Sequence, residues 1–208
     1  MSCGDDFINL RETEVTVCQG QVVSARRYVY DSSHRLVATY SAPVGMPVSS
    51  AYQLGTYEYA ASDALKAAIS LPEYSYRYNE WGDLVEVAFN GEVLSSFVWG
   101  YRGSHPVAEI KGLAYDQLLA LSPQGLDVPS LRERSDLTAA DLEAIRQAFP
   151  GHEVTTLTYD WLVGVGTMTD PRGVTTTFTY DGLGRLDGVK DLNGYYIRKY
   201  DYHYANQQ

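Results

Sequence analysis

The chain has 208 residues, of which 45% are hydrophobic and 20% are charged, a composition typical of a globular protein with one large domain or two small ones. Its formal net charge of −10 argues against a surface for nucleic acid or an anionic membrane, because an excess of Lys and Arg over acidic residues is needed to neutralise phosphates. No apolar run approaches the length of a membrane span and the start lacks the pattern of a signal peptide, so we expect neither.

The first segment, residues 1–73, is predicted to contain one or two strands, a degraded copy of a hairpin unit and a short helix at 62–69. The degraded copy reads YVYDSSHRLVATY at 28–40, and His34 stands where a turn of this kind usually has glycine. Histidine tolerates a left-handed backbone better than most residues, so a tight turn remains possible there.

Residues 74–208 are predicted to form one antiparallel sheet interrupted by helices. Tyr74, Tyr76 and Tyr78 alternate with other residues, which is the period of a strand. Asn79–Gly82 is a predicted turn, and Asn90-Gly91 is the strongest short hairpin signal in the chain. The strand that follows places four apolar residues on one side: Val93, Phe97, Trp99 and Tyr101.

Residues 102–152 interrupt this rhythm and are predicted to form a helical insertion packed on one sheet face. Helices are expected at 113–121 and 138–149. Thr138 is a suitable N-cap for the second helix, and Asp141 stands at the capping-box position three residues later. The apolar stripe of this helix consists of Leu142, Ile145 and Phe149.

Residues 153–204 are predicted to form a meander of short strands that turn about every ten residues. Asp160, Asp170, Asp181 and Asp191 stand at intervals of 10, 11 and 10, and each is followed by a glycine: Gly164, Gly173, Gly184 and Gly194. Aspartate accepts hydrogen bonds from backbone N–H groups just ahead of it, and glycine adopts the positive φ that closes such a turn. Tyr159, Tyr180 and Tyr202 stand 21 and 22 residues apart, which marks one unit of two strands.

The last unit reads YDGLGRLDGVKDLNG and resembles the YD repeat of the Rhs (rearrangement hotspot) family of bacterial secreted or cell-surface proteins. Seven residues carry the signature: Tyr180, Asp181, Gly184, Arg185, Leu186, Asp191 and Gly194. Less complete copies lie at 74–101 and 154–180, and a poor one lies at 28–40. The resemblance therefore covers residues 74–204 well and residues 1–73 weakly.

In this family the repeats form long antiparallel sheets that curl into a spiral or a closed shell, and some shells enclose a toxin. The resemblance implies a mainly β fold, an antiparallel β-meander of hairpins in a curled sheet, with a helical insertion around 113–149. About four repeats are too few to close a shell, and the self-cleaving C-terminal core of the family has no counterpart here. It thus implies a non-enzymatic structural or binding module, a fragment or truncated relative of a larger secreted or surface protein. A shell segment of a toxin-delivery protein without its toxin is an alternative.

The sequence contains no clear catalytic or metal-binding constellation. The Asp191–Gly194 turn offers oxygens, but an EF-hand loop needs a longer series of them and a closing Glu. The four histidines lack metal-ligand spacing, and Gly103-Ser104-His105 only distantly resembles a nucleophile elbow. We expect no enzymatic activity, no cofactor and no metal. The sequence leaves open whether Cys3 and Cys18 form a disulfide.

The terminal stretch YYIRKYDYHY supplies the candidate binding surface, and it is predicted to be one strand over 195–204. Strand alternation would place four tyrosines on one face: Tyr196, Tyr200, Tyr202 and Tyr204. Such rings can stack on sugars, although packing between strands is the favoured explanation. The open edge of this strand could instead recruit further repeats or a second copy. The candidate partners are therefore protein or glycan.

Overall fold

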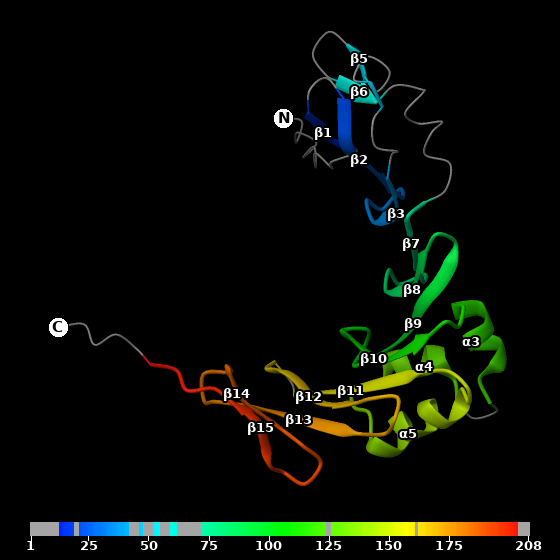
Figure 1. The fold of residues 1–208 in the computed structure, drawn as a ribbon. Coiled ribbons are helices and arrows are strands. Elements are labelled where there is room, and N and C mark those ends of the chain that lie inside the picture. The colour runs from blue at the N-terminus through cyan, green and yellow to red at the C-terminus, as the bar shows by residue number, and fades with distance from the viewer. Residues whose placement is uncertain are drawn as a thin grey trace, which may run out of the picture. The chain divides into compact units, whose positions relative to one another are not determined.

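The structure is a computed structural model that describes residues 13–18, 21–41, 46–47, 52–54, 59–61, 72–123, 126–160 and 162–203 (Figure 1). The predicted helix at 62–69, Cys3 and Tyr204 lie outside these residues, so the pairing of Cys3 with Cys18 stays untested. The chain divides into two compact units. The first comprises Met1–Arg77 and Val87–Glu92, and the second comprises Tyr78–Glu86 and Val93–Gln208.

The predicted mainly β meander is confirmed. Strands of the main sheet follow one another in chain order, from β1 to β3 and from β7 to β15, while β4 pairs with β2 beside this path and β5 pairs with β6 separately. The pairs β1–β2, β2–β3 and β3–β7, and every pair from β9–β10 to β14–β15, are antiparallel, as expected of successive hairpins. The strands are β1 (Thr13–Cys18), β2 (Gln21–Tyr30), β3 (Leu36–Ser41), β4 (Met46–Pro47), β5 (Tyr52–Leu54), β6 (Tyr59–Ala61), β7 (Tyr74–Tyr78), β8 (Leu84–Phe89), β9 (Glu92–Gly100), β10 (His105–Lys111), β11 (Val154–Asp160), β12 (Gly164–Thr169), β13 (Thr175–Tyr180), β14 (Leu186–Lys190) and β15 (Tyr196–Lys199).

The first unit contains the degraded repeat. Strands β2 and β3 pair with Tyr28 opposite Thr39, and β3 continues to β7 with Ala38 opposite Ser75. His34, in the turn between β2 and β3, has a φ of 61°, as its place in the repeat predicted. The Asn90-Gly91 turn has φ values of 49° and 84°, the paired positive values of a type I′ hairpin.

The second unit contains three helices: α3 (Tyr115–Leu121), α4 (Val128–Glu133) and α5 (Ala139–Ala148). They gather beside β9, β10 and β11, as Figure 1 shows, and α5 contacts β10 and β11. None of the helices in the described part of the chain is long and apolar enough to cross a membrane.

The predicted limits of the insertion, 102–152, were too wide. Residues 105–111 form β10, which pairs with both β9 and β11 and so belongs to the sheet. Val107 and Ile110 are fully buried in this strand, because a central strand next to the helices is enclosed on both faces. Helices α3 and α5 were predicted, whereas α4 was missed because it is only six residues long.

The capping box of α5 is confirmed. The N–H of Asp141 donates to Thr138 Oγ1 at 3.3 Å, and the N–H of Thr138 donates to Asp141 Oδ2 at 2.7 Å. Arg134 pairs with the same carboxylate at 2.7 Å. The Arg134 guanidinium, together with the Thr138 hydroxyl and N–H, lowers the pKa of Asp141 to about 2.

The most buried side of β9 is the one opposite Phe97 and Trp99. Ser96, Val98 and Gly100 point into the core, while Trp99 is half-buried and donates from Nε1 to the carbonyl of Leu84 at 2.7 Å. A Cβ at Gly100 would lie 2.5 Å from Cδ1 of Leu137. Small residues are therefore needed on this side because the insertion packs closely against it. The core is formed by Val85, Val98, Val107, Ala108, Ile110, Leu113, Tyr115, Leu118, Val128, Leu131, Leu142, Ile145, Phe149 and Val154.

Candidate functional site

The Asp181–Arg185 turn between β13 and β14 shows what the signature residues do. Oδ1 of Asp181 accepts hydrogen bonds from the N–H groups of Leu183 and Arg185 at 2.9 and 3.0 Å. Oδ2 pairs with the Arg185 guanidinium at 2.5 to 2.8 Å. Gly184 has a φ of 73° and donates its N–H to the carbonyl of Asp181 at 2.9 Å. Together these bonds hold the hairpin in register.

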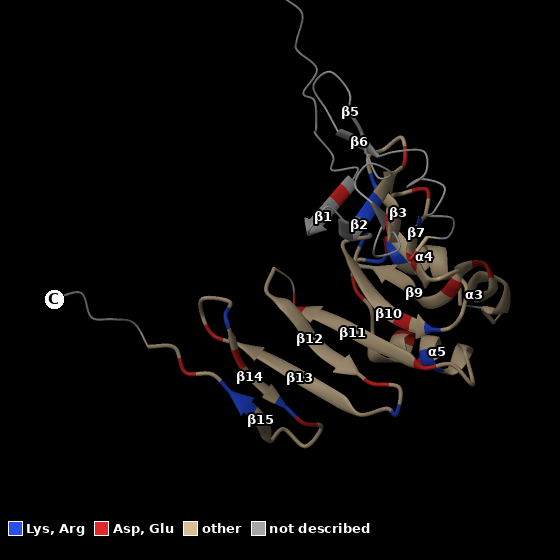
Figure 2. Cartoon of the chain, turned by 45° about the horizontal axis from the view of Figure 1, so that its top comes forward, with Lys and Arg blue, Asp and Glu red and all other residues tan. Residues whose placement is uncertain are grey.

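Four other turns repeat this geometry. In each, one side-chain oxygen of the first residue accepts from the N–H groups two and four positions ahead, at distances of 2.8 to 3.1 Å. The first residues are Asp31, Asn79, Asp170 and Asp191. Asn79 shows that the turn does not require a charge. Figure 2 marks the acidic members in red at the tips of the β12–β13, β13–β14 and β14–β15 hairpins.

These contacts also lower the pKa of the carboxylates of Asp181 and Asp170. The pKa of Asp181 is lowered, chiefly by the Arg185 side chain and then by backbone N–H groups. The pKa of Asp170 is lowered chiefly by the N–H of Val174. A carboxylate with a lowered pKa stabilises the fold above its unfolded pKa of about 3.9, and that contribution is lost as pH falls through the folded pKa.

We expect Asp181→Asn to preserve the turn, because Asn79 already does so, and to weaken the decline in stability below about pH 4. Asp181→Ala removes the acceptor of two N–H groups and should lower the thermal midpoint by a few degrees even at pH 7. Thermal melts of both variants at pH 7 and pH 3 test this. An Asn variant with the pH dependence of the parent chain would contradict it.

Three tyrosines at the repeat spacing fasten each unit to the preceding strand. The hydroxyls of Tyr159, Tyr180 and Tyr202 donate to the carbonyls of Pro106, Val165 and Leu186, each at 2.9 Å. Burial, and then the neighbouring Tyr101, raises the pKa of Tyr159, which keeps this hydroxyl protonated as a donor. The spacing of 21 and 22 residues thus corresponds to one hydrogen bond repeated along the sheet.

The predicted terminal strand over 195–204 is too long, because β15 ends at Lys199. Beyond it, the N–H of Tyr200 donates to the carbonyl of Asp187 at 2.8 Å, and the hydroxyl of Tyr202 bonds to Leu186 at the start of β14. The Arg185 guanidinium lies 4.2 Å from the centre of the Tyr202 ring. Tyr202 therefore makes the same hydrogen bond to the preceding strand as Tyr159 and Tyr180. Strand alternation does not place it on one face with Tyr196.

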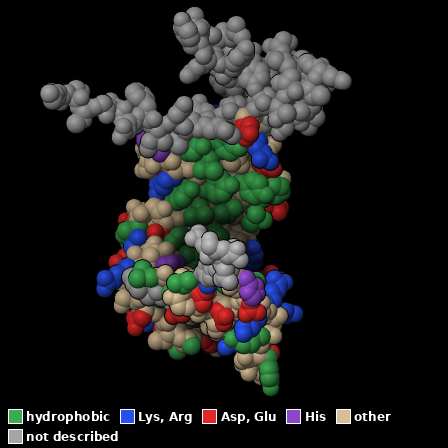
Figure 3. All heavy atoms as spheres, turned by 90° about the vertical axis from the view of Figure 1, so that its left-hand side faces the viewer, with side chains coloured by type: hydrophobic (Ala, Val, Ile, Leu, Met, Phe, Trp, Pro, Cys, Tyr) green, Lys and Arg blue, Asp and Glu red, His purple; other side chains and the backbone are tan. Residues whose placement is uncertain are grey.

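Tyr196 lies between two lysines, which sequence reasoning did not single out. Its ring centre is 4.7 Å from Nζ of Lys190 and 5.8 Å from Nζ of Lys199. Gly188 makes room for this ring, since a Cβ there would collide with Cε1 of Tyr196. Tyr196 is 48% exposed, so the cluster is open to solvent. On the face of the molecule that Figure 3 shows, acidic and basic side chains are interspersed, and neither charge forms a broad region.

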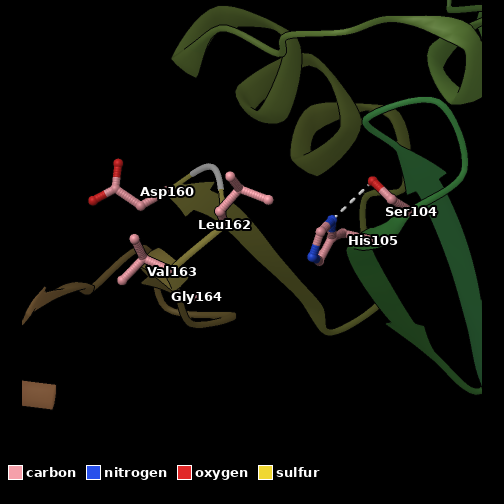
Figure 4. A pocket seen from close by; sticks show the side chains of 6 residues that line it. All are labelled: Ser104, His105, Asp160, Leu162, Val163 and Gly164. Carbon is pink, nitrogen blue, oxygen red and sulfur yellow. Dashed lines mark hydrogen bonds between the residues drawn. The ribbon is translucent and has the colours of Figure 1, made fainter. Parts of the chain in front are cut away.

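Ser104 and His105 line a hollow of about 410 Å³ together with Asp160, Leu162, Val163 and Gly164 (Figure 4). The Ser104 hydroxyl donates to the carbonyl of Tyr101 at 2.5 Å and lies 2.9 Å from Nδ1 of His105. The Ser104 hydroxyl proton is therefore directed to the carbonyl of Tyr101 and not to His105. The Asp160 carboxylate points away from His105 in Figure 4. The arrangement is therefore not that of a nucleophile and its base.

In the predicted turn at Asp191, one carboxylate oxygen binds backbone N–H groups. Its Oδ1 accepts from the N–H groups of Asn193 and Tyr195, both at 2.9 Å. Over the residues that the structure describes, no group of three or more His, Cys, Asp or Glu side chains is placed to hold a metal ion.

Comparison with known proteins points to a repeat. The family model described as RHS Repeat matches residues 160–195. No curated protein matches the sequence. Among solved structures, the crystal structure of TcdB2-TccC3 without its hypervariable C-terminal region is 13% identical with a TM-score of 0.41, and the match covers 86% of this chain and 8% of that one. The structure of TcdB2-TccC3-TEV is 13% identical with a TM-score of 0.30, covering 84% and 8%. The chain thus spans about 8% of the length of these structures.

Proposed function

Residues 160–195 belong to the RHS repeat family, and on this premise we propose that the chain is a non-enzymatic structural module of a larger secreted or cell-surface repeat protein. The free edge of β15 carries this proposal. Among the described strands of the second unit, β15 pairs only with β14, and all four of its residues are exposed. A free edge offers N–H and C=O groups to a further strand. The module would therefore present a sheet for extension by protein.

The repeated turn and the repeated tyrosine hydrogen bond support this role. Each of these hydrogen bonds joins a tyrosine to the neighbouring strand that precedes it in the chain, so the same bond can fix the register of one strand after another. Most residues of β12 to β14 are half-buried. This is expected of a sheet made of repeated hairpins and less so of a sheet that encloses a binding site.

Association through β15 tests the proposal. We expect the sedimentation coefficient of the purified chain to rise with concentration at about 0.5 M salt, where charge repulsion is screened. Amide exchange over 196–199 should slow in parallel, while exchange over the central strand β11, the control, should not change. A monomer at every concentration, with fast exchange over 196–199, would contradict the proposal.

Glycan binding is a second candidate, favoured by the exposure of aromatic rings near β15. Tyr195 is 73% exposed, and Tyr196 and Tyr202 are 48% and 46% exposed. A glycan array followed by Tyr200→Ala and Tyr202→Ala tests it, with Tyr180→Ala as a control for loss of the fold. Binding no stronger than background would exclude this function.

A further inference from the structure

We propose that β15 pairs with an acidic strand, and that a carboxylate of this strand lies opposite Lys199 and interacts with both Lys199 and Lys190. The inference rests on the proposed function, because it requires that the β15 edge be extended by another strand. It adds the chemistry by which that strand is chosen.

The register places the two lysines on one face. Lys190 is opposite Tyr196, and Lys199 is opposite Gly188 across the β14–β15 pair. On the other side of β14, Thr177 is opposite Lys190 and Thr179 is opposite Gly188, so the face continues over β13 as threonine. Residues directly opposite one another in an antiparallel pair point to the same side of the sheet. Figure 2 shows the basic ends of β14 and β15 in blue.

Charge makes this cluster unusual in a chain with a net charge of −10. Two ammonium groups converge on the ring of Tyr196. Within the described ranges, none of Lys190, Arg198 and Lys199 forms an ion pair with an acidic side chain. The ring compensates only part of two converging positive charges, whereas a carboxylate would compensate them more fully.

The backbone of β15 directs where that carboxylate would stand. Because the N–H of Tyr200 points to Asp187 on β14, the N–H of the preceding residue, Lys199, points toward the free edge. A strand added there would place one residue directly opposite Lys199, with Cβ atoms about 4.5–5.5 Å apart. A Glu at that position would lie beside Lys199, and Lys190 is on the same face of the sheet, one strand further in.

The same charges oppose pairing of β15 with β15 of a second copy. Such a pair would bring Lys190, Arg198 and Lys199 of two molecules together, and like charges opposite one another destabilise a sheet. Salt should therefore have opposite effects on the two events. It should strengthen pairing between identical basic edges and weaken binding of an acidic strand.

Binding of two synthetic peptides to the full chain tests the proposal. One is a ten-residue peptide of alternating Glu and Val, and the other has Gln in place of every Glu. We expect the Glu peptide to bind at least tenfold more tightly at low salt, to slow amide exchange at 196–199, and to lose its advantage at about 0.5 M salt. Lys190→Gln and Lys199→Gln should each reduce that advantage several-fold. Arg172→Gln is the matched control, since it removes one charge from a side chain that is 84% exposed in another turn.

Reversing the charge at Lys199 distinguishes a misfolded edge from the loss of the preference for acidic peptides. Lys199→Glu should bind a Lys/Val peptide more tightly than the Glu/Val peptide, which a misfolded edge would not do. Equal binding of Glu and Gln peptides, with the 196–199 amides protected, would overturn the acidic preference and leave the proposed extension standing. If neither peptide protects these amides and the chain does not associate, the proposed function fails as well.

Discussion

Replacing Arg132 by Ala is expected to lower the free energy of unfolding of the second unit by about 3–5 kcal/mol, the cost of leaving a buried carboxylate without its cationic partner. Nε of Arg132 donates to Oδ2 of Asp83 at 2.6 Å, and the two side chains are only 17% and 9% exposed. The guanidinium also lies 5.0 Å from the ring centre of Trp81. This one side chain joins α4 to the turn that precedes β8.

Urea unfolding followed by circular dichroism measures the effect. Nη2 of Arg132 also donates to Oδ1 of Asp83 at 3.4 Å. Arg132→Lys keeps the charge but cannot make both contacts, so an intermediate loss is expected. Adding Asp83→Asn to the Ala variant should recover part of the stability, since the unpaired buried group is then neutral. A loss below about 1 kcal/mol for Arg132→Ala would place this pair among surface ion pairs and contradict the prediction.

Ile145→Ala is expected to cost about 2–5 kcal/mol, because it opens a cavity in the core under α5. Ile145 is fully buried, as are Ile110 on β10 and Leu118 on α3. The helices and β10 share this core, so the change should unfold them together. Ile145→Val, which removes a single methylene, should cost about 0.5–1.5 kcal/mol.

Leu121→Ala is the control for this experiment. Leu121 is also on a helix of the insertion, but it is 59% exposed, and its truncation should change the free energy of unfolding by no more than about 0.5 kcal/mol. Similar losses for Ile145→Ala and Leu121→Ala would show that the insertion does not share the core of the sheet.

The features that the sequence determined by itself are those formed within a few residues. The Asp181 turn is closed by bonds to residues two and four positions ahead, and the α5 cap joins residues three apart. His34 could be assigned to the glycine position for the same reason, since the turn around it repeats the Asp181 pattern. Strand alternation and the tyrosine spacing also recur at short period, so the meander and its resemblance were predictable.

Tertiary structure alone decided features that join distant residues or depend on what covers a face. Arg132 and Asp83 are 49 positions apart, and no local pattern pairs them. On β9 the buried side carries Ser96, Val98 and Gly100, and the close approach of Leu137 to Gly100 cannot be read from strand alternation. The position of Lys190 and Lys199 beside one tyrosine ring depends on the register of the β14–β15 pair, which includes an irregularity between Val189 and Lys190. A shift of one residue exchanges the faces of a strand, and only the paired strand selects the register.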